Sequence, residues 1–365
     1  MVKYEVRTEK AILRRAICQA KKCIFGNVTL WKMAAFLEIL SQTNEKTKTS
    51  LTAINGVFQR AFLALGMCVD AFTNTTRVIG LDACHVKAPY GGVILVKTVQ
   101  DGNGQVFPGA LGIAESENVE TWGWFLDLVK QAFHIEDDGK GVVALSDREK
   151  GIDLALGTVI PNSNHSFCLY HIMKNNKTRF HTSLNGLPFV AAKAANVSQF
   201  NEIIQLIKSL HREAGEYLEG VDPAKWARAF FLAHRFVHVT SNISESMNWW
   251  LEYAQHYDPV RLFSCYIRKL NQLFEKRRDE YATVPATSFP ENVSQALQEN
   301  MAEAWSLRGE EDCEDRTECN DSTTQAPQEL LHSEWQVVLV AISQSLAFRA
   351  ATFAQLQSPS GSIPA

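Results

Sequence analysis

Hydrophobic residues change their spacing along the chain, and this change separates a helical beginning from a strand-rich middle. Over residues 7–73 hydrophobic side chains recur every three or four positions, as at Phe58, Phe62 and Leu65. Such spacing is typical of amphipathic helices. The sequence therefore predicts an N-terminal helical region over residues 1–75.

From Arg77 onward, short hydrophobic runs predict buried strands. The first run, Val78 to Leu81, ends on Asp82, and two further runs flank the segment 101–104, whose sequence is Asp-Gly-Asn-Gly. Asp-Gly between two hydrophobic runs is a strong hairpin signal, because both residues tolerate a positive φ. Strands are predicted at residues 78–82, 92–100, 106–115, 142–145 and 166–169, and helices at 119–134 and from about 149.

This order of elements predicts the fold class and the domain organisation. Three strands, a helix, a strand, a helix and a last strand are the order of an α/β, RNase H-like fold, a mixed five-stranded sheet with helices on both faces. We assign this core to residues 76–171. Residues 172–239 are predicted to form an inserted helical subdomain without strands, residues 240–282 the C-terminal helices that complete the core, and residues 283–365 an acidic, polar and poorly ordered tail.

Composition and charge fit an intracellular, soluble protein. The chain is 46% hydrophobic and 21% charged, and no hydrophobic stretch approaches the roughly 20 residues of a membrane helix. The net charge is −4, yet residues 1–50 hold ten Lys or Arg against four Asp or Glu. That basic excess is consistent with contact to a nucleic acid or, alternatively, with an ordinary solvated surface. Eight cysteines without paired spacing suggest no disulfide framework.

Two aspartates follow predicted strands and are candidate metal ligands. Asp82 ends the first strand and Asp147 follows the fourth, so both carboxylates are expected at the edge of the sheet where α/β proteins place ligands. Two converging carboxylates repel each other unless a cation lies between them, and Mg²⁺ suits such oxygen ligands. The alternative is that each aspartate caps the turn after its strand.

A third acidic ligand is predicted at Glu245. The run Thr240-Ser241-Asn242 can cap a helix, and Glu245 then falls in the first turn. The specific alternative is a capping box, in which Glu245 closes back on Asn242.

Five motifs, in order and with appropriate gaps, resemble the Mutator-like element (MULE/MuDR) transposase domain family. The resemblance extends over about residues 10–285. It is carried by Gly80-Leu81-Asp82-Ala83 with Lys87, by Asp101 to Gly104 leading through Pro108 to Glu115-Ser116-Glu117 and Trp122-Gly123-Trp124-Phe125, by Ser146-Asp147-Arg148 with Gly151, by Cys168-Leu169-Tyr170-His171, and by Thr240 to Asn248.

The resemblance implies a DDE-type DNA transposase whose acidic triad is Asp82, Asp147 and Glu245. The intervals between these residues are 65 and 98 positions, and an inserted helical subdomain accounts for the longer one. The triad would hold two Mg²⁺ or Mn²⁺ ions for DNA strand cleavage and strand transfer. Lys87 and Arg148 are candidate phosphate contacts, although Lys87 also suits a solvated surface. We expect DNA as the partner, a homo-oligomer on DNA, no membrane association and a nuclear location.

Cys168 and His171 carry two alternative interpretations. With His165, or with the pair His234 and His238, they suggest a Zn²⁺ site, but zinc sites usually need four ligands in two pairs. The other interpretation places Cys168 and His171 beside the active site as packing or support.

Two other functions are compatible with the sequence. The family commonly carries a DNA-binding module upstream and a small zinc module downstream, and neither is recognisable here. The chain is therefore alternatively a degenerate copy, or a transposase-derived DNA-binding or regulatory protein that no longer cuts. An RNase H-like nuclease acting on RNA fits the fold but not the motif around Glu245.

Overall fold

The computed structural model describes most of the chain between residues 30 and 282. The described residues are 30–73, 75, 77–100, 105–148, 150–182, 184, 186–231, 251–282, 294, 295, 298 and 301. The predicted tail over residues 283–365 lies almost wholly outside them. So does Glu245 with its motif, and so do His234 and His238.

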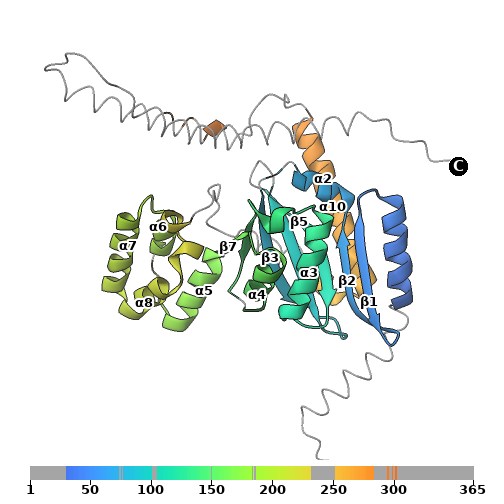
Figure 1. Cartoon of the computed structure of the whole chain (residues 1–365), viewed down its shortest axis with the longest axis horizontal. Helices are drawn as coiled ribbons and strands as arrows, with labels where there is room; N and C mark the ends of the chain where they lie inside the picture. The colour runs from blue at the N-terminus through green and yellow to red at the C-terminus, as the bar shows by residue number, and fades with distance from the viewer. Residues whose placement is uncertain are drawn as a thin grey trace, which may run out of the picture. The chain divides into compact units, whose positions relative to one another are not determined.

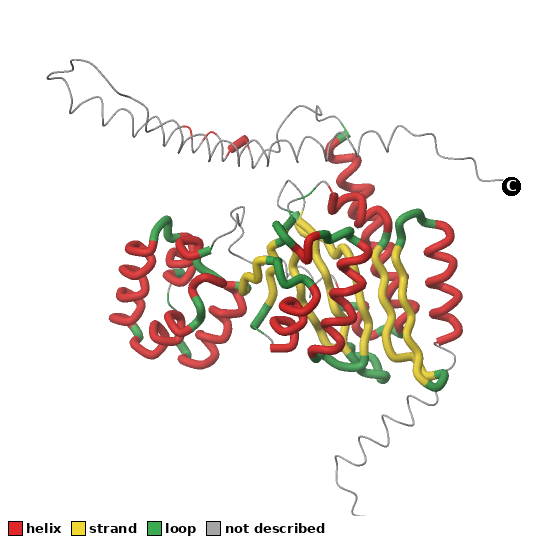
Figure 2. Tube along the Cα trace, viewed as in Figure 1, coloured by secondary structure: helices red, strands yellow, loops and turns green. Residues whose placement is uncertain are grey.

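The described chain is a mixed α/β protein built on one sheet of seven strands in the order β1-β2-β5-β4-β3-β6-β7 (Figures 1 and 2). The strands are β1 (Lys48–Ile54), β2 (Val57–Ala64), β3 (Val78–His85), β4 (Val93–Gln100), β5 (Val106–Ala114), β6 (Val143–Ser146) and β7 (Asn164–Phe167). Strand β3 pairs antiparallel with β4 and parallel with β6, and β6 pairs parallel with β7. The α/β class is therefore confirmed, and the sheet has two strands more than the five predicted.

The two additional strands lie in a region for which helices were predicted. Residues 30–43 are helical, but β1 and β2 form an antiparallel hairpin in which Ile54 pairs with Val57. Its two-residue turn, Asn55 and Gly56, has φ angles of 51° and 74°. A positive φ at both turn positions is the type I′ geometry that Asn-Gly favours. The helical prediction was wrong here because Asn55-Gly56 favours a hairpin more strongly than the spacing of Phe58, Phe62 and Leu65 favours a helix.

The remaining predicted strands are confirmed, with shifts at their ends. The two longest, β4 and β5, match the predicted ranges to within one residue, and the hairpin segment 101–104 between them is outside the described residues. Strand β7 begins two residues earlier than predicted. Strand β3 continues past Asp82 to His85, so Asp82 lies inside the strand and not at its end.

Helices cover both faces of the sheet. Helices α3 (Val119–Ala132) and α4 (Lys150–Val159) lie in front of it in Figure 1, and α10 (Pro259–Tyr281) lies behind it. Phe125 of α3 packs edge-on against Phe62 of β2, with ring centroids 5.6 Å apart. Tyr266 of α10 donates a hydrogen bond to the carbonyl oxygen of Pro108 at 3.1 Å. The short helix α2 (Gly66–Thr73) follows β2.

Residues 169–220 form a group of helices with its own hydrophobic core. These helices are α5 (Leu169–Phe180), α6 (Leu187–Lys193), α7 (Val197–Leu210) and α8 (Arg212–Gly220), followed by 3₁₀ turns at Pro223–Lys225 and Arg228–Phe230 (Figure 1). Leu169, Phe200, Leu218 and Trp226 are buried together in it. We call residues 169–231 the helical subdomain. No strand occurs among its described residues, as the sequence predicted.

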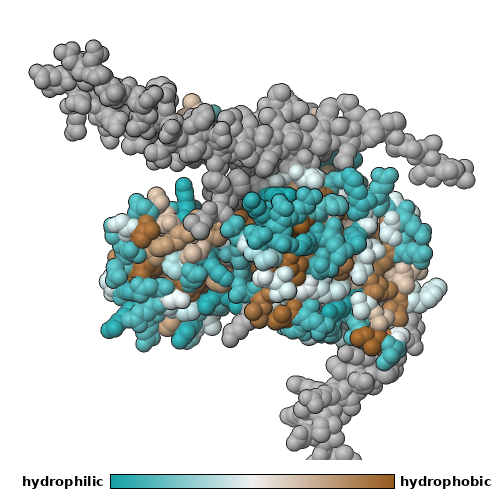
Figure 3. All heavy atoms as spheres, in the orientation of Figure 1, coloured by the Kyte–Doolittle hydropathy of each residue, from teal (hydrophilic) through white to brown (hydrophobic). Residues whose placement is uncertain are grey.

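The surface of the described chain is mixed in polarity. Figure 3 shows hydrophobic residues in separate patches between hydrophilic ones on the visible face. Among the described residues, no helix combines the length and hydrophobicity needed to cross a membrane. The described residues of the sheet, apart from Gln100, belong to the same compact unit as the helical subdomain. The domain boundaries predicted above remain predictions.

Candidate active site

The parallel pairing of β3 with β6 puts the two predicted catalytic aspartates at matching positions of neighbouring segments. Gly80 of β3 pairs with Leu145 of β6. Asp82 lies two residues after Gly80, inside β3, and Asp147 lies two residues after Leu145, just past the end of β6. If the register continues by those two residues, both aspartates face the same side of the sheet, because paired residues of neighbouring strands share a face. Their joint role as metal ligands stays a prediction.

The two aspartates differ in burial. Asp82 is 9% exposed, and one of its carboxylate oxygens accepts a hydrogen bond from the backbone N–H of Ala83 at 2.9 Å. Asp147 is the first residue after β6 and is half-buried. Within the described residues, no group of three or more His, Cys, Asp or Glu side chains forms a metal site. Two oxygen donors on one face fit Mg²⁺ in kind, and further ligands have to come from water, substrate or another residue.

Cys84, two residues after Asp82, shares its face and had no role assigned from the sequence. Burial, aided by the negative charges of Asp82 and Glu117, raises the pKa of the Cys84 thiol to about 12. The thiol is therefore protonated at neutral pH and adds no charge beside Asp82.

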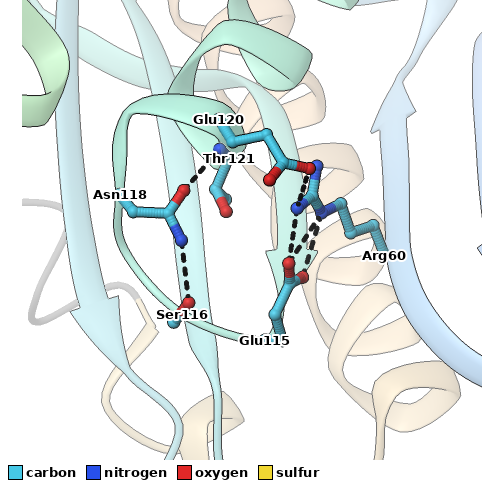
Figure 4. Close-up of polar contacts among 6 residues, drawn as sticks. All are labelled: Arg60, Glu115, Ser116, Asn118, Glu120 and Thr121. Atoms are coloured by element: carbon cyan, nitrogen blue, oxygen red, sulfur yellow. Dashed lines mark hydrogen bonds and ion pairs between the residues drawn. The ribbon is translucent and has the colours of Figure 1, made fainter.

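The loop that carries Glu117 is fixed by a buried ion pair (Figure 4). Arg60 of β2 is 9% exposed and donates two hydrogen bonds from Nε to the carboxylate of Glu115, at 2.9 and 3.1 Å. Its Nη2 contacts Glu115 as well and lies 3.0 Å from Oε1 of Glu120. The hydrogen bonds to Glu115 are the main reason that the pKa of Arg60 is raised, so the charge is retained.

Further contacts of the same loop join it to α3 and α4. Asn118 caps α3 by accepting the backbone N–H of Thr121 at 2.9 Å, and Trp122 donates from Nε1 to Glu117 at 3.1 Å. Gly151, in the first turn of α4, lies so close that an added Cβ would be 3.2 Å from the backbone of Asn118 and Val119. The glycine therefore lets α4, which begins just after Asp147, pack directly on this loop.

A hydrogen-bonded chain runs from Ser146 to the helical subdomain and was not predicted. His165 of β7 contacts Ser146 Oγ through Nε2 and Asp153 through Nδ1, both at 2.8 Å. Asp153 also accepts from Lys225 Nζ at 2.9 Å. The Ser146 hydroxyl hydrogen-bonds to the carbonyl oxygen of Asp147 at 2.7 Å. The chain ties the backbone around Asp147 to α4 and β7.

This Ser–His–Asp arrangement resembles a nucleophilic triad, but burial argues against that chemistry. Ser146 is 2% exposed, so no substrate carbonyl or phosphate can reach its hydroxyl without rearrangement. Burial is also the largest cause that lowers the pKa of His165, which favours the neutral imidazole. Both ring nitrogens of His165 are engaged in these contacts, so neither is available for the zinc site considered above.

Cys168 and His171 lie at the junction between β7 and α5. Cys168 is buried and is the N-cap of α5, where its Sγ accepts the backbone N–H of His171 at 3.4 Å. The backbone N–H of Cys168 donates to the carbonyl oxygen of Ser146 at 2.8 Å. These contacts place the pair one strand away from Asp147. Their role as active-site support remains a prediction.

The two candidate phosphate contacts are both exposed. Lys87 follows β3, and its backbone N–H donates to the carbonyl oxygen of Gln255 at 2.8 Å. Arg148 follows Asp147 directly, and its Nη1 donates to the hydroxyl of Tyr217 at 2.6 Å. Arg148 therefore contacts the helical subdomain, which no sequence pattern had indicated.

A known protein family matches the segment that holds these residues. The sequence model of the MULE transposase domain matches residues 78–175, from the first residue of β3 into α5. No curated protein matches the chain. The matched segment contains Asp82, Asp147, Cys168 and His171, and it ends before Glu245. Residues 78–175 are thus similar to the MULE transposase domain, the family that the motifs in the sequence resemble.

Proposed function

We propose that the chain is the catalytic core of a DDE-type DNA transposase with an RNase H-like fold. The observation that carries the proposal is the parallel β3–β6 register, in which Asp82 and Asp147 each follow the paired residues Gly80 and Leu145 by two positions. The order β5-β4-β3-β6-β7, with β3 antiparallel to β4 and parallel to β6, supports the fold assignment. In this proposal β1 and β2 extend the RNase H-like sheet on the β5 side.

Asp82, Asp147 and Glu245 would hold two Mg²⁺ or Mn²⁺ ions. When bound, these ions would activate the attacking water or DNA 3′-hydroxyl and stabilise the leaving 3′-oxygen. The protein positions its carboxylates through the backbone: Asp82 through the centre of β3, and Asp147 through the Ser146–His165–Asp153 chain. The protonated thiol of Cys84 keeps a further negative charge away from Asp82.

The remaining expectations follow from the same proposal. DNA is the substrate, with transposon ends and target both bound, and the protein acts as a homo-oligomer in the nucleus. Lys87 and Arg148 contact DNA phosphates. Cys168 and His171 support the active site from the start of α5.

Cleavage of DNA by variants that keep the shape of a carboxylate side chain but remove its charge tests the proposal. We expect the full chain to nick supercoiled plasmid DNA with Mg²⁺ or Mn²⁺, and Asp82→Asn, Asp147→Asn and Glu245→Gln each to abolish nicking, because each removes a charge that holds the metal ions. Asp127→Asn is the matched control: Asp127 is an exposed residue of α3 whose carboxylate accepts a hydrogen bond from Gln131.

The outcomes separate the enzyme from the alternatives. If Asp147→Asn nicks as fast as Asp127→Asn, the metal site has been assigned to the wrong residues. If the unaltered chain binds DNA but nicks none with either metal, the DNA-binding or regulatory function replaces the transposase. Mn²⁺ binding to the parent, measured by electron paramagnetic resonance and lost in Asp82→Asn, would establish the site independently of turnover.

A further inference from the structure

Two arginines from distant parts of the sequence meet on one tyrosine beside Asp147. Arg148 follows Asp147, and its guanidinium carbon lies 5.5 Å from the ring centroid of Tyr217 on α8. Arg179, near the end of α5, has its guanidinium carbon 5.9 Å from the same ring. The hydrogen bond from Arg148 Nη1 to the Tyr217 hydroxyl, at 2.6 Å, fixes one of the two side chains further.

Aromatic rings hold this arginine pair in place. Arg148 lies 6.0 Å from the ring centroid of Phe167, and Arg179 lies 5.3 Å from that of Phe180. The rings of Phe180 and Tyr217 pack edge-on with centroids 5.9 Å apart, and both pack against the core of the helical subdomain. The arginines are therefore ordered by stacking, and their charged ends remain exposed to solvent.

The arginine pair lacks the carboxylate partners that the neighbouring cations have. In the same subdomain Lys208 pairs with Glu219 at 2.7 Å, Arg212 with Glu216 at 2.8 Å and Lys225 with Asp153 at 2.9 Å. Among the described residues, neither Arg148 nor Arg179 forms such an ion pair. Helix α5 also contains no Asp or Glu, and its Lys174 and Lys177 are exposed.

We propose that Arg148 and Arg179, held on Tyr217, form a binding site for a phosphate group of the DNA backbone next to the catalytic aspartates. Both guanidinium carbons lie within 6 Å of the centroid of the same ring. Guanidinium groups bind phosphate through paired hydrogen bonds, and a bound anion offsets the repulsion between two nearby cations. The inference rests on the proposed function for its ligand, and it adds that the helical subdomain takes part in substrate binding. Phosphate contacts carry no sequence information, so the site positions DNA whatever its sequence.

The salt dependence of DNA binding by the full chain tests this site. A fluorescent DNA duplex of about 40 base pairs, longer than the core domain is wide, is titrated over a range of KCl concentrations without divalent metal. The parent is compared with Arg148→Gln, Arg179→Gln and the double variant. Each phosphate contact removed lowers the magnitude of the slope of log K against log[salt] by about 0.9. Because the two arginines bind one phosphate, the single variants should lose part of this amount and the double variant all of it. Arg212→Gln removes the same charge from an ion pair in the same subdomain and should leave the slope unchanged.

Two further variants separate charge from position. Arg179→Lys keeps the charge and should keep the slope, while Tyr217→Phe keeps the ring but removes the acceptor for Arg148 and should weaken binding less than Arg148→Gln. Because Arg179 is exposed, its variants are expected to melt at the parent temperature. Arg179→Gln therefore carries the test even if Arg148→Gln folds poorly.

The possible results distinguish this inference from the proposed function. A parent that nicks plasmid, together with Arg148→Gln and Arg179→Gln slopes equal to that of Arg212→Gln, overturns the phosphate site and leaves the transposase proposal standing. If the arginine variants have smaller slopes than the parent but the parent cuts no DNA, the phosphate site is supported and the transposase proposal is rejected. A parent that binds no DNA at all rejects both.

Discussion

A single residue, Lys97, shows how strongly the tertiary environment can change the burial and the pKa of a side chain. Lys97 lies in β4, a strand whose eight residues are all buried. Its Nζ has no hydrogen-bond partner among the described residues and lies 3.9 Å and 3.3 Å from the ring centroids of Phe72 and Phe133. Burial lowers the pKa of Lys97 well below its usual value. The hydrophobic run predicted the strand, but nothing local in it predicted a fully buried amine.

Replacing Lys97 by Met should stabilise the fold. The methionine keeps the length of the side chain and removes a polar group whose unsatisfied burial costs about 1–3 kcal/mol. We expect the free energy of unfolding in urea to rise by about that amount. Lys48→Met, in the half-buried edge strand β1, is the control and should change it by less than about 0.5 kcal/mol. A loss of stability in Lys97→Met would mean that the amine has a favourable role in the core.

The same lysine predicts a pH dependence with a definite sign. Below the unfolded pKa of 10.5 the unfolded chain binds a proton at Lys97, while the folded chain leaves the amine neutral until its much lower folded pKa is reached. Stability should therefore rise with pH in this window. Between pH 7 and 9, below the ionisation of buried Cys68 and Tyr266, the parent should gain stability relative to Lys97→Met. Parallel urea curves at every pH would contradict the assignment of a neutral lysine.

At the scale of elements, segments with a long hydrophobic period were predicted correctly, and the main error came from a turn whose signal was overlooked. Helix α3 and strands β4 and β5 were found within two residues of their predicted ends, because long hydrophobic periods are strong signals. The β1–β2 hairpin was missed because Asn55-Gly56 outweighs a weak helical spacing. The clamp of Arg60 on Glu115 could not be predicted, since Arg60 lies in β2 and Glu115 in the loop after β5, 55 residues away.

The Arg60 clamp should depend on Glu115 far more than on Glu120. Both carboxylates contact the same guanidinium, but the side chain of Glu115 is 29% exposed and that of Glu120 is 82% exposed. We expect Glu115→Gln to cost about 1–3 kcal/mol of unfolding free energy, and Glu120→Gln at most about 0.5 kcal/mol. Chemical denaturation of the two isosteric variants measures the difference. Equal losses would show that the clamp acts as an ordinary surface ion pair.

At the scale of the whole molecule, the helical subdomain has a core of its own beside the sheet. Sequence predicted its helices and the absence of strands, because residues 172–235 show no alternating pattern. It did not predict the contacts that join the subdomain to the sheet, Lys225 with Asp153 and Arg148 with Tyr217. Each joins residues more than 60 positions apart, and neither leaves a periodic trace in the sequence. The matching positions of Asp82 and Asp147 were predictable because each residue directly follows a hydrophobic run, while their metal chemistry stays a prediction.

Because the helical subdomain has a core of its own, a substitution in that core should destabilise the subdomain without destabilising the sheet. Trp226 is fully buried, packs on Phe200 and donates to the carbonyl oxygen of Val221 at 3.1 Å. Trp226→Ala should cost about 3–5 kcal/mol and be felt mainly within residues 169–231. Hydrogen exchange followed by mass spectrometry should show faster exchange in α5–α8 and unchanged protection in β3 and β4. Equal loss of protection in the sheet would indicate a single cooperative core.

The placement of β3 between β4 and β6 has a consequence for the newborn chain on the ribosome. Strand β4 follows β3 after seven residues, so these two can pair as soon as they emerge, whereas β6 is synthesised much later and must close a long loop to reach Gly80. Until then Asp82 has no carboxylate neighbour on β6. Asp147 therefore reaches Asp82 late in folding. The repulsion between the two carboxylates arises only after β3 and β4 have already paired.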